Sequence, residues 1–317
     1  MKTGSTVAIV CGTALLIAAA VGVIMSRNRR QPLPPPEAPV AASPAEVRVR
    51  AVEQKGEPIA QGAVAAASGA IAIICGTDEA TADRYEARND ALRSIARRRN
   101  LPKNDVAALM AYLAGTNDSL RVERVAALKN DVMNLLRFQE PVPENLAGTL
   151  IGMFNGGRHP PVVLDYCIQH LGAMLDEVDE ATRLRVREVL VRAACMTKQP
   201  YAGTALYSLA DDKMATPAQG AELRRMAIAL CAPEANNAAR IAAIQLAGQM
   251  GYAEALPILR ETLAGSRRDV VLDIVCIGSL GLLGNESDIP LVSRFSGRGG
   301  RFAVAVESAI KRIEGER

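Results

Sequence analysis

The sequence predicts an all-α fold, an α-solenoid of about six stacked helix pairs, and three observations support this prediction. The first is a repeat: Gly248, Gly251 and Pro257 return 33 residues later as Gly281, Gly284 and Pro290. The second is composition, because the chain is only 3% aromatic and has no Trp, which favours close packing of small and branched side chains. The third is the helical spacing of apolar residues from Tyr85 onward, broken by short Gly, Pro and Asn segments. A fixed period of this length is typical of helix pairs that bury their apolar faces against neighbouring pairs.

A membrane anchor is predicted for residues 1–30. Residues 7–25 carry no charge over 19 positions, and a helix of that length spans the roughly 30 Å hydrocarbon core of a bilayer. Arg27, Arg29 and Arg30 follow at once, and their positive charge predicts a single pass through a bacterial inner membrane with the rest of the chain in the cytoplasm. A periplasmic domain is the alternative orientation. A cleaved signal peptide is the alternative to an anchor, because Ala18 and Ala20 fit the small-residue pattern of a cleavage site.

A Pro-rich linker and a capping helix are predicted next. Seven prolines lie in residues 31–58, and this density favours extended polyproline II geometry, so the segment is interpreted as a spacer. Residues 59–83 include an Ala-rich stretch with few large apolar side chains. That composition favours a helix covering the end of the repeat over a second membrane span.

The repeat domain is predicted for residues 84–317, with units that begin near residues 84, 120, 161, 201, 238 and 270. Gly251 is expected to end the first helix of its unit, because glycine accepts the left-handed conformation without a Cβ clash. Pro257 and Pro290 are expected in the first turn of a second helix, where a missing N–H is tolerated. We expect the second helix of each unit to line a concave binding face, with candidate segments at residues 106–113, 146–153 and 257–263.

One unit resembles a known repeat family. Residues 240–259 contain Arg-x-x-Ala-Ile, Leu-Ala-Gly and Gly-x-x-x-Ala-Leu-Pro-Ile-Leu in that order. This pattern is similar to the HEAT repeats of the bacterial lyase-type branch, and the resemblance covers residues 84–313. It implies stacked helical hairpins that bind other proteins. The His-Glu dipeptides that HEAT-repeat di-iron hydroxylases use as ligands are missing, because Pro160 follows His159 and Leu171 follows His170.

Together these features predict a membrane-anchored HEAT-repeat scaffold that mediates protein–protein interaction with an unidentified partner. No pattern indicates catalytic residues, a cofactor or a metal site, so the sequence predicts that the chain is not an enzyme. The net charge of +3 originates in residues 1–58, which hold seven Lys and Arg against four Glu. The repeat domain is therefore neutral, which disfavours nucleic acid as a partner.

Two alternatives stay open. Arginine clusters recur at similar places in successive units, and such clusters predict a basic ridge that binds nucleic acid or anionic lipid. The residues of this ridge are Arg97, Arg98, Arg99, Arg224, Arg225, Arg267 and Arg268. The other alternative is a lyase-like enzyme with a pocket around Asp165, Cys167 and His170.

The cysteines and histidines are expected to have structural roles. No C-x-x-C pair occurs, and Cys167, Cys231 and Cys276 fall in apolar stripes, so we expect free buried thiols. His170 is expected to be a packed or hydrogen-bonded histidine of a helix. His159 is expected to be a solvated loop residue.

Overall fold

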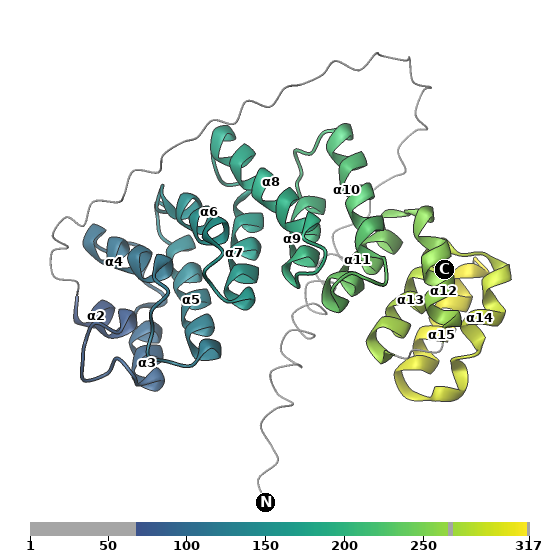
Figure 1. Ribbon diagram of the computed structural model, residues 1–317, viewed down its shortest axis with the longest axis horizontal. Helices are drawn as coiled ribbons and strands as arrows, with labels where there is room; N and C mark the ends of the chain where they lie inside the picture. Colours follow the sequence, from purple (N-terminus) through teal and green to yellow (C-terminus); the bar gives the residue numbers. More distant parts are fainter. Residues whose placement is uncertain (1–67, 266–268, 316–317) are drawn as a thin grey trace, which may run out of the picture. The chain divides into compact units, whose positions relative to one another are not determined.

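A computed structural model describes residues 68–265 and 269–315, and these residues form helices and no strand. The predicted all-α fold is therefore confirmed for this part of the chain. Fourteen α-helices follow one another along it (Figure 1): α2 (Gly69–Cys75), α3 (Tyr85–Ile95), α4 (Lys103–Ala114), α5 (Val122–Arg137), α6 (Leu146–Gly156), α7 (Pro161–Met174), α8 (Glu180–Cys195), α9 (Tyr201–Ala210), α10 (Pro217–Leu230), α11 (Asn237–Met250), α12 (Leu256–Ala264), α13 (Val270–Leu283), α14 (Ile289–Ser293) and α15 (Gly300–Ile313). Short 3₁₀ turns precede α12, α14 and α15, at Ala253–Ala255, Glu286–Asp288 and Ser296–Arg298.

The helices form two layers. Each even-numbered helix packs against the odd-numbered helix that follows it, and the odd-numbered helices from α3 to α15 pack on one another in chain order. We call the odd-numbered helices the odd layer and the even-numbered helices the even layer. Towards the C-terminus, consecutive helices approach much more closely in the odd layer than in the even layer. This succession of pairs is consistent with the predicted α-solenoid.

The pairing differs from the predicted units. Those units begin at α3, α5, α7, α9, α11 and α13, but each of these helices packs more closely with the even-numbered helix before it than with the even-numbered helix after it. The candidate segments 106–113, 146–153 and 257–263 consequently lie in α4, α6 and α12, in the even layer. Towards the C-terminus successive helices approach more closely in the odd layer, but α4 and α6 approach each other at least as closely as α3 and α5 do. The expectation that the three segments line a concave face stays a prediction.

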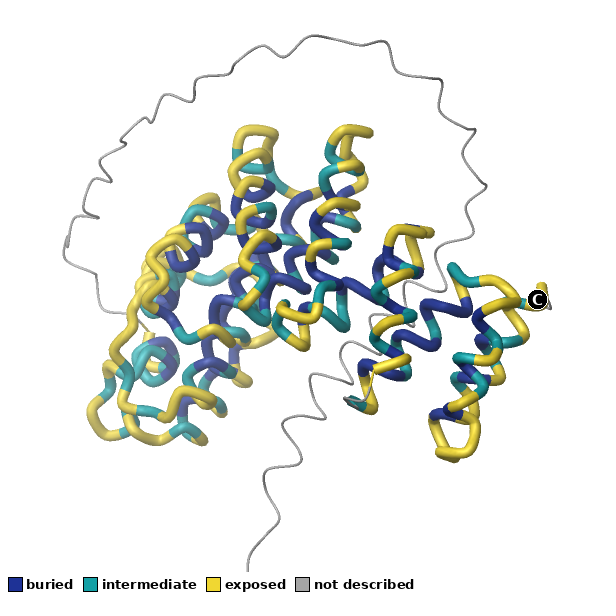
Figure 2. The backbone as a smooth tube through the Cα atoms, turned by 45° about the vertical axis from the view of Figure 1, so that its right-hand side comes forward, coloured by how far each residue is buried: buried dark blue, intermediate teal, exposed yellow. Residues whose placement is uncertain are grey.

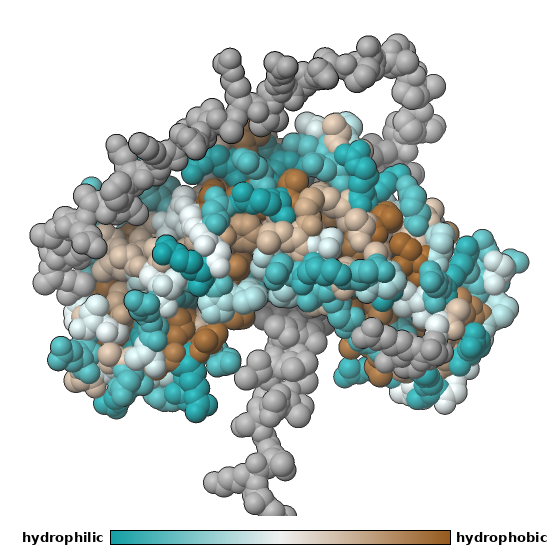
Figure 3. All heavy atoms as spheres, in the orientation of Figure 1, coloured by the Kyte–Doolittle hydropathy of each residue, from teal (hydrophilic) through white to brown (hydrophobic). Residues whose placement is uncertain are grey.

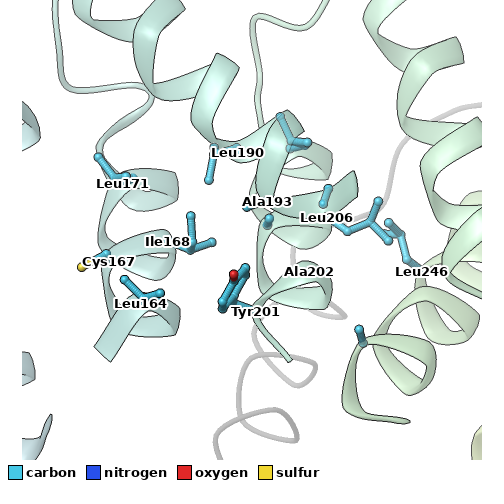
Figure 4. Packing of buried hydrophobic residues seen from close by; sticks show 14 of the residues in the cluster. Leu164, Cys167, Ile168, Leu171, Leu190, Ala193, Tyr201, Ala202, Leu206 and Leu246 are labelled. Atoms are coloured by element: carbon cyan, nitrogen blue, oxygen red, sulfur yellow. The ribbon is translucent and has the colours of Figure 1, made fainter. Parts of the chain in front are cut away.

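The hydrophobic core lies between the two layers, and the buried stretches of the helices face it (Figure 2). Ile168 of α7, Leu190 of α8 and Leu206 of α9 are all fully buried in it (Figure 4). The predicted free thiols are confirmed, because the cysteines that lie in the apolar stripes are unpaired and buried: Cys167, Cys231 and Cys276.

Close contacts between small residues set the spacing of the odd layer. A Cβ atom on Gly281 of α13 would lie 2.7 Å from the Cα of Ala309 in α15. A Cβ on Gly248 of α11 would lie 2.8 Å from the Oγ of Ser279 in α13. Any larger residue at these glycines would force the helices apart. The 33-residue recurrence of Gly248 and Gly281 therefore marks helix packing.

The other recurring pair of glycines has two different roles. Gly251 ends α11 with φ +72°, in the left-handed region, as predicted. Gly284 ends α13 with φ −77°, so the left-handed conformation does not explain it. A Cβ on Gly284 would lie 2.7 Å from the Oδ2 of Asp288, so this glycine leaves room for a buried carboxylate. Pro257 stands in the first turn of α12, as predicted.

Ion pairs with buried carboxylates join neighbouring elements. The Asp212 carboxylate, in the connection after α9, accepts hydrogen bonds from Arg183 at 2.9 Å and Arg187 at 3.0 Å, both in α8. Arg260 of α12 donates to both carboxylate oxygens of Asp288, at 2.7 and 3.0 Å. The hydrogen bonds from Arg260 lower the pKa of Asp288. Because a buried charge that loses its partner is costly, these pairs hold the elements in place.

No helix among the described residues is long and apolar enough to cross a membrane. The predicted anchor at residues 1–30 and the predicted linker at residues 31–58 lie outside the described residues.

Two glycines of α13 offer a matched test of the packing. We expect Gly281→Ala to lower the free energy of unfolding by about 1–3 kcal/mol, because its methyl group would overlap Ala309. Gly278, three residues earlier, has no atom within 4 Å of its Cβ position. Gly278→Ala should therefore raise the stability, by about 0.5–1 kcal/mol, through the helix propensity of alanine. Urea unfolding followed by circular dichroism measures both, and equal effects from the two substitutions would contradict the role of close packing.

Candidate functional site

The arginines of the predicted basic ridge lie in different kinds of element. Arg97, Arg98 and Arg99 are in the α3–α4 connection, Arg224 and Arg225 are in α10, and Arg267 and Arg268 lie outside the described residues. Two of these arginines form ion pairs, Arg99 with Glu140 at 2.6 Å and Arg224 with Glu254 at 3.3 Å. The ridge stays a prediction.

The exposed face of the odd layer has a more regular organisation. In each of the five odd-numbered helices from α5 to α13, one residue of this face directly follows two buried core residues. Four of these five residues have side chains that can donate or accept hydrogen bonds: Asn134 in α5, Gln169 in α7, Tyr207 in α9 and Gln245 in α11. We call these four residues the polar row. The fifth position is Gly278 in α13, so the row ends there.

The polar row has unused hydrogen-bonding capacity. The hydroxyl of Tyr207 and the Oε1 of Gln245 are buried and have no partner. Burial raises the pKa of Tyr207 to about 12, so the phenol keeps its proton at neutral pH. Buried polar atoms are normally paired, so an unpaired one is costly to the folded chain.

Two carboxylates lie one helical turn before the row. Asp131 precedes Asn134 in α5, and Asp165 precedes Gln169 in α7. Burial raises the pKa of Asp165, and hydrogen bonds from Thr204 and Gln169 lower it only in part. The Oδ1 of Asp165 is buried without a partner.

Asp131 and Asp165 act on a common neighbour. Burial raises the pKa of Tyr166, and the charges of Asp165 and Asp131 raise it further. Burial also raises the pKa of Asp131, while the charge of Arg93 in α3 lowers it. Arg93 is a cation, whereas the groups that lower the pKa of Asp165 are neutral.

An open groove of about 550 Å³ adjoins these groups, between α3 and α5. Asn89 and Arg93 line one side of it, and Asp131, Asn134 and the exposed ring of Phe138 line the other. The groove therefore offers hydrogen-bonding, charged and aromatic groups to a ligand.

The face becomes apolar towards the C-terminus. Ile241 in α11 and Ile274 in α13 stand where α5 and α7 carry their carboxylates. Val271 and Leu282 of α13 are both exposed. A mixture of polar and apolar patches is also visible on the face of the molecule that Figure 3 shows.

The predicted cluster of Asp165, Cys167 and His170 does not converge on a pocket. Cys167 is fully buried, and burial raises the pKa of its thiol to about 12. His170 is also buried, and its Nε2 lies 3.2 Å from the Oδ1 of Asn130, which confirms the predicted structural role. Burial lowers the pKa of His170 to about 4, so the imidazole is neutral at pH 7. Of the three residues, Asp165 alone reaches the exposed face.

The expectation for His159 is wrong, because the side chain is buried with only 7% of its surface exposed. It forms a hydrogen bond to the backbone of Ala114, and burial lowers its pKa to about 4. Lys129 lies close to it and donates to the carbonyl groups of Leu113, at 2.7 Å, and Gly115. His159 and Lys129 therefore bond to the free backbone groups at the C-terminal end of α4. The position of His159 between two predicted helices does not reveal this role.

The comparisons with known proteins provide one match. No protein-family model matches the chain, and no curated protein matches it. Among solved structures, human deoxyhypusine hydroxylase in complex with glycerol matches at 14% sequence identity, over 78% of this chain and 98% of that chain, with a TM-score of 0.32. At this TM-score the match transfers no activity to the present chain.

The matched protein is nevertheless an enzyme, and the prediction that this chain is not an enzyme is contradicted by that finding. We therefore withdraw that prediction.

The raised pKa of Asp165 predicts a pH-dependent stability difference. Its ordinary value is 3.8, and the folded protein favours the protonated form. The resulting stabilisation is present below 3.8 and is lost as the pH rises through the folded pKa. Asp165→Asn, which stays neutral, should therefore be more stable than the wild type near pH 7, and the difference should shrink towards about pH 4.

Urea midpoints over this pH range measure the difference. Glu188→Gln removes a carboxylate from the exposed surface of α8 and is the matched control. A stability gain that grows on acidification would contradict the assignment.

Proposed function

We propose that the chain binds a partner protein on the exposed face of the odd layer, as a membrane-anchored HEAT-like scaffold. The observation that carries this proposal is the polar row, which presents hydrogen-bonding side chains at one register in four successive helices. A core position would not need these groups, and a purely solvated face would leave them fully exposed. Instead Gln169 is exposed, and Asn134, Tyr207 and Gln245 are partly buried.

The composition of the face also supports a protein partner. Polar groups and two carboxylates occupy α5 to α9, and apolar side chains such as Ile274 and Leu282 follow in α13. Protein interfaces combine apolar area with hydrogen bonds in this way. The close packing of the odd layer gives the face a rigid base, which lowers the entropic cost of binding.

A second candidate is a lyase-like enzyme, and one observation favours it. Burial raises the pKa of Asp165, and the Thr204 hydroxyl bonds to its carboxyl group. A carboxylic acid with a raised pKa on an accessible face is typical of acid–base sites. A thermal-shift screen of metabolites against the full chain and Asp165→Asn would support this candidate if a compound stabilised the wild type alone.

Site-specific crosslinking tests the scaffold proposal. A photo-crosslinking amino acid is placed at Ala173, which is exposed on the odd-layer face of α7, and at Ala107, which is exposed on α4. In cells that express the chain natively, we expect one defined protein adduct from position 173 and none from position 107. Equal yields at the two positions, or none at either, would count against the proposed face.

The membrane location has its own test. We propose that residues 1–30 anchor the chain in the inner membrane with the repeat domain on the cytoplasmic side. The full chain should stay in the membrane pellet after alkaline carbonate extraction, and a chain that lacks residues 1–30 should not. A mature N-terminus beyond Ala20, read by mass spectrometry, would show a cleaved signal peptide instead.

A further inference from the structure

The groove between α3 and α5 opens on the odd-layer face where this layer is most loosely packed. Successive odd-numbered helices approach each other least closely at this place, and neither α3 nor α5 contains a glycine that would draw the two together. Leu92 and Leu135 form the apolar floor of the groove. Its volume of about 550 Å³ lies within the range of about 300–1,000 Å³ that is typical of ligand sites.

Two amide side chains in the groove are available to a ligand. Asn89 of α3 and Asn134 of α5 line the groove and are partly buried. Neither side chain forms a hydrogen bond with another described residue, and neither has a polar atom that is fully buried without a partner. Both amide groups therefore reach solvent. An amide donates and accepts at once, which suits the N–H and C=O groups of an extended main chain.

An exposed aromatic ring lies at one end of the groove. Phe138 directly follows α5 and has 59% of its surface exposed. Ala96, which directly follows α3, also lines the groove. The chain segments beyond these two residues are joined, because the Nε2 of Gln139 donates to the carbonyl oxygen of Arg98 at 2.8 Å. Aromatic rings are enriched at the centres of protein interfaces, so the ring of Phe138 is suited to contact an apolar side chain of a partner.

Two arginines adjoin the Phe138 end of the groove. Arg97 and Arg98 are both exposed, and neither forms an ion pair with another described residue. The next residue differs, because Arg99 is paired with Glu140 at 2.6 Å. The positive charge of Arg97 and Arg98 is complementary to an Asp or Glu side chain of a ligand.

The charges inside the groove disfavour nucleic acid. Asp131 lines the groove and faces Arg93, so these two charges offset each other. A phosphate backbone in the groove would meet the Asp131 carboxylate, and the repeat domain as a whole is neutral, whereas nucleic-acid sites are strongly positive. A peptide has an uncharged main chain, so it can enter the groove and keep its carboxylates at the end beside the arginines.

We propose, on the basis of the function proposed above, that this groove binds a short, extended acidic segment of the partner protein. The main chain of the segment bonds to Asn89 and Asn134, and one of its apolar side chains packs on Phe138. An Asp or Glu of the segment pairs with Arg97 or Arg98. Helix α3 has 11 residues and is therefore about 16 Å long, which corresponds to about five residues of an extended chain.

Selection from random peptides tests the charge of the segment. A display library of short linear peptides is panned against the purified full chain and against a double variant that carries Arg97→Glu and Arg98→Glu. We expect Asp or Glu to be enriched beside an apolar residue with the wild type, and this acidic enrichment to disappear with the double variant. Arg185→Glu, which reverses an exposed charge of α8 in the even layer, is the matched control and should leave the enrichment unchanged.

Affinity measurements on one selected peptide test the other contacts. Phe138→Ala should weaken binding by about tenfold or more, as the loss of a central aromatic contact does. Asn134→Ala should weaken it by about three- to tenfold, as the loss of one or two hydrogen bonds does. Met214→Ala and Asn104→Ala remove exposed side chains elsewhere on the chain and should leave binding unchanged. Unchanged urea midpoints show that the variants fold.

The possible results separate this inference from the proposed function. A selection that yields no peptide, peptides without acidic residues, or binding that ignores Phe138→Ala would overturn the acidic segment. A single-stranded oligonucleotide that binds the wild type and not the double variant would overturn it as well. A crosslink at Ala173 would in each case still support a protein partner on the odd-layer face. Without that crosslink, acidic peptides that need Phe138 would support the groove and contradict the wider face.

Discussion

The structure depends on the close approach of successive helices in the odd layer. In four places among the described helices a glycine, which has no Cβ atom, meets a small residue of the next odd-numbered helix: Gly172 meets Ser208, Gly203 meets Ala242, Gly248 meets Ser279, and Gly281 meets Ala309. The helices approach this closely because each glycine has a hydrogen atom where any other residue has its Cβ atom. A larger residue at any of these glycines would break the contact, because a packed interior cannot take in an added carbon atom without displacing its neighbours.

This packing decides which face is free. The odd-numbered helices are covered on two sides by their neighbours in the layer and on a third by the even layer. One strip of each helix remains exposed, and from α7 to α15 the glycine contacts bring successive helices of the layer together. The side chains on these strips are therefore brought into rows by the same contacts that hold the layer together.

The sequence revealed the fold more fully than the site. The 33-residue recurrence of Gly248 and Gly281 was sufficient to predict helix pairs, because packing demands small residues at a fixed place in each unit. Which helix pairs with which could not be read from it, since a repeat has the same period whichever boundary is chosen. The polar row was missed because its members are 35, 38 and 38 residues apart and of three residue types, so no motif repeats. The burial pattern of the structure is what aligns them.

The polar groups on the odd-layer face are costly to the folded chain, and this cost is the argument for their function. Asp165 would ionise freely in water, yet burial raises its pKa and leaves one oxygen unpaired. The equivalent strip of α13 has Ile274 and Gly278, so neither a carboxylate nor an amide is required to build a helix pair at this register. Residues that weaken a fold without serving its packing are retained where they contact something else.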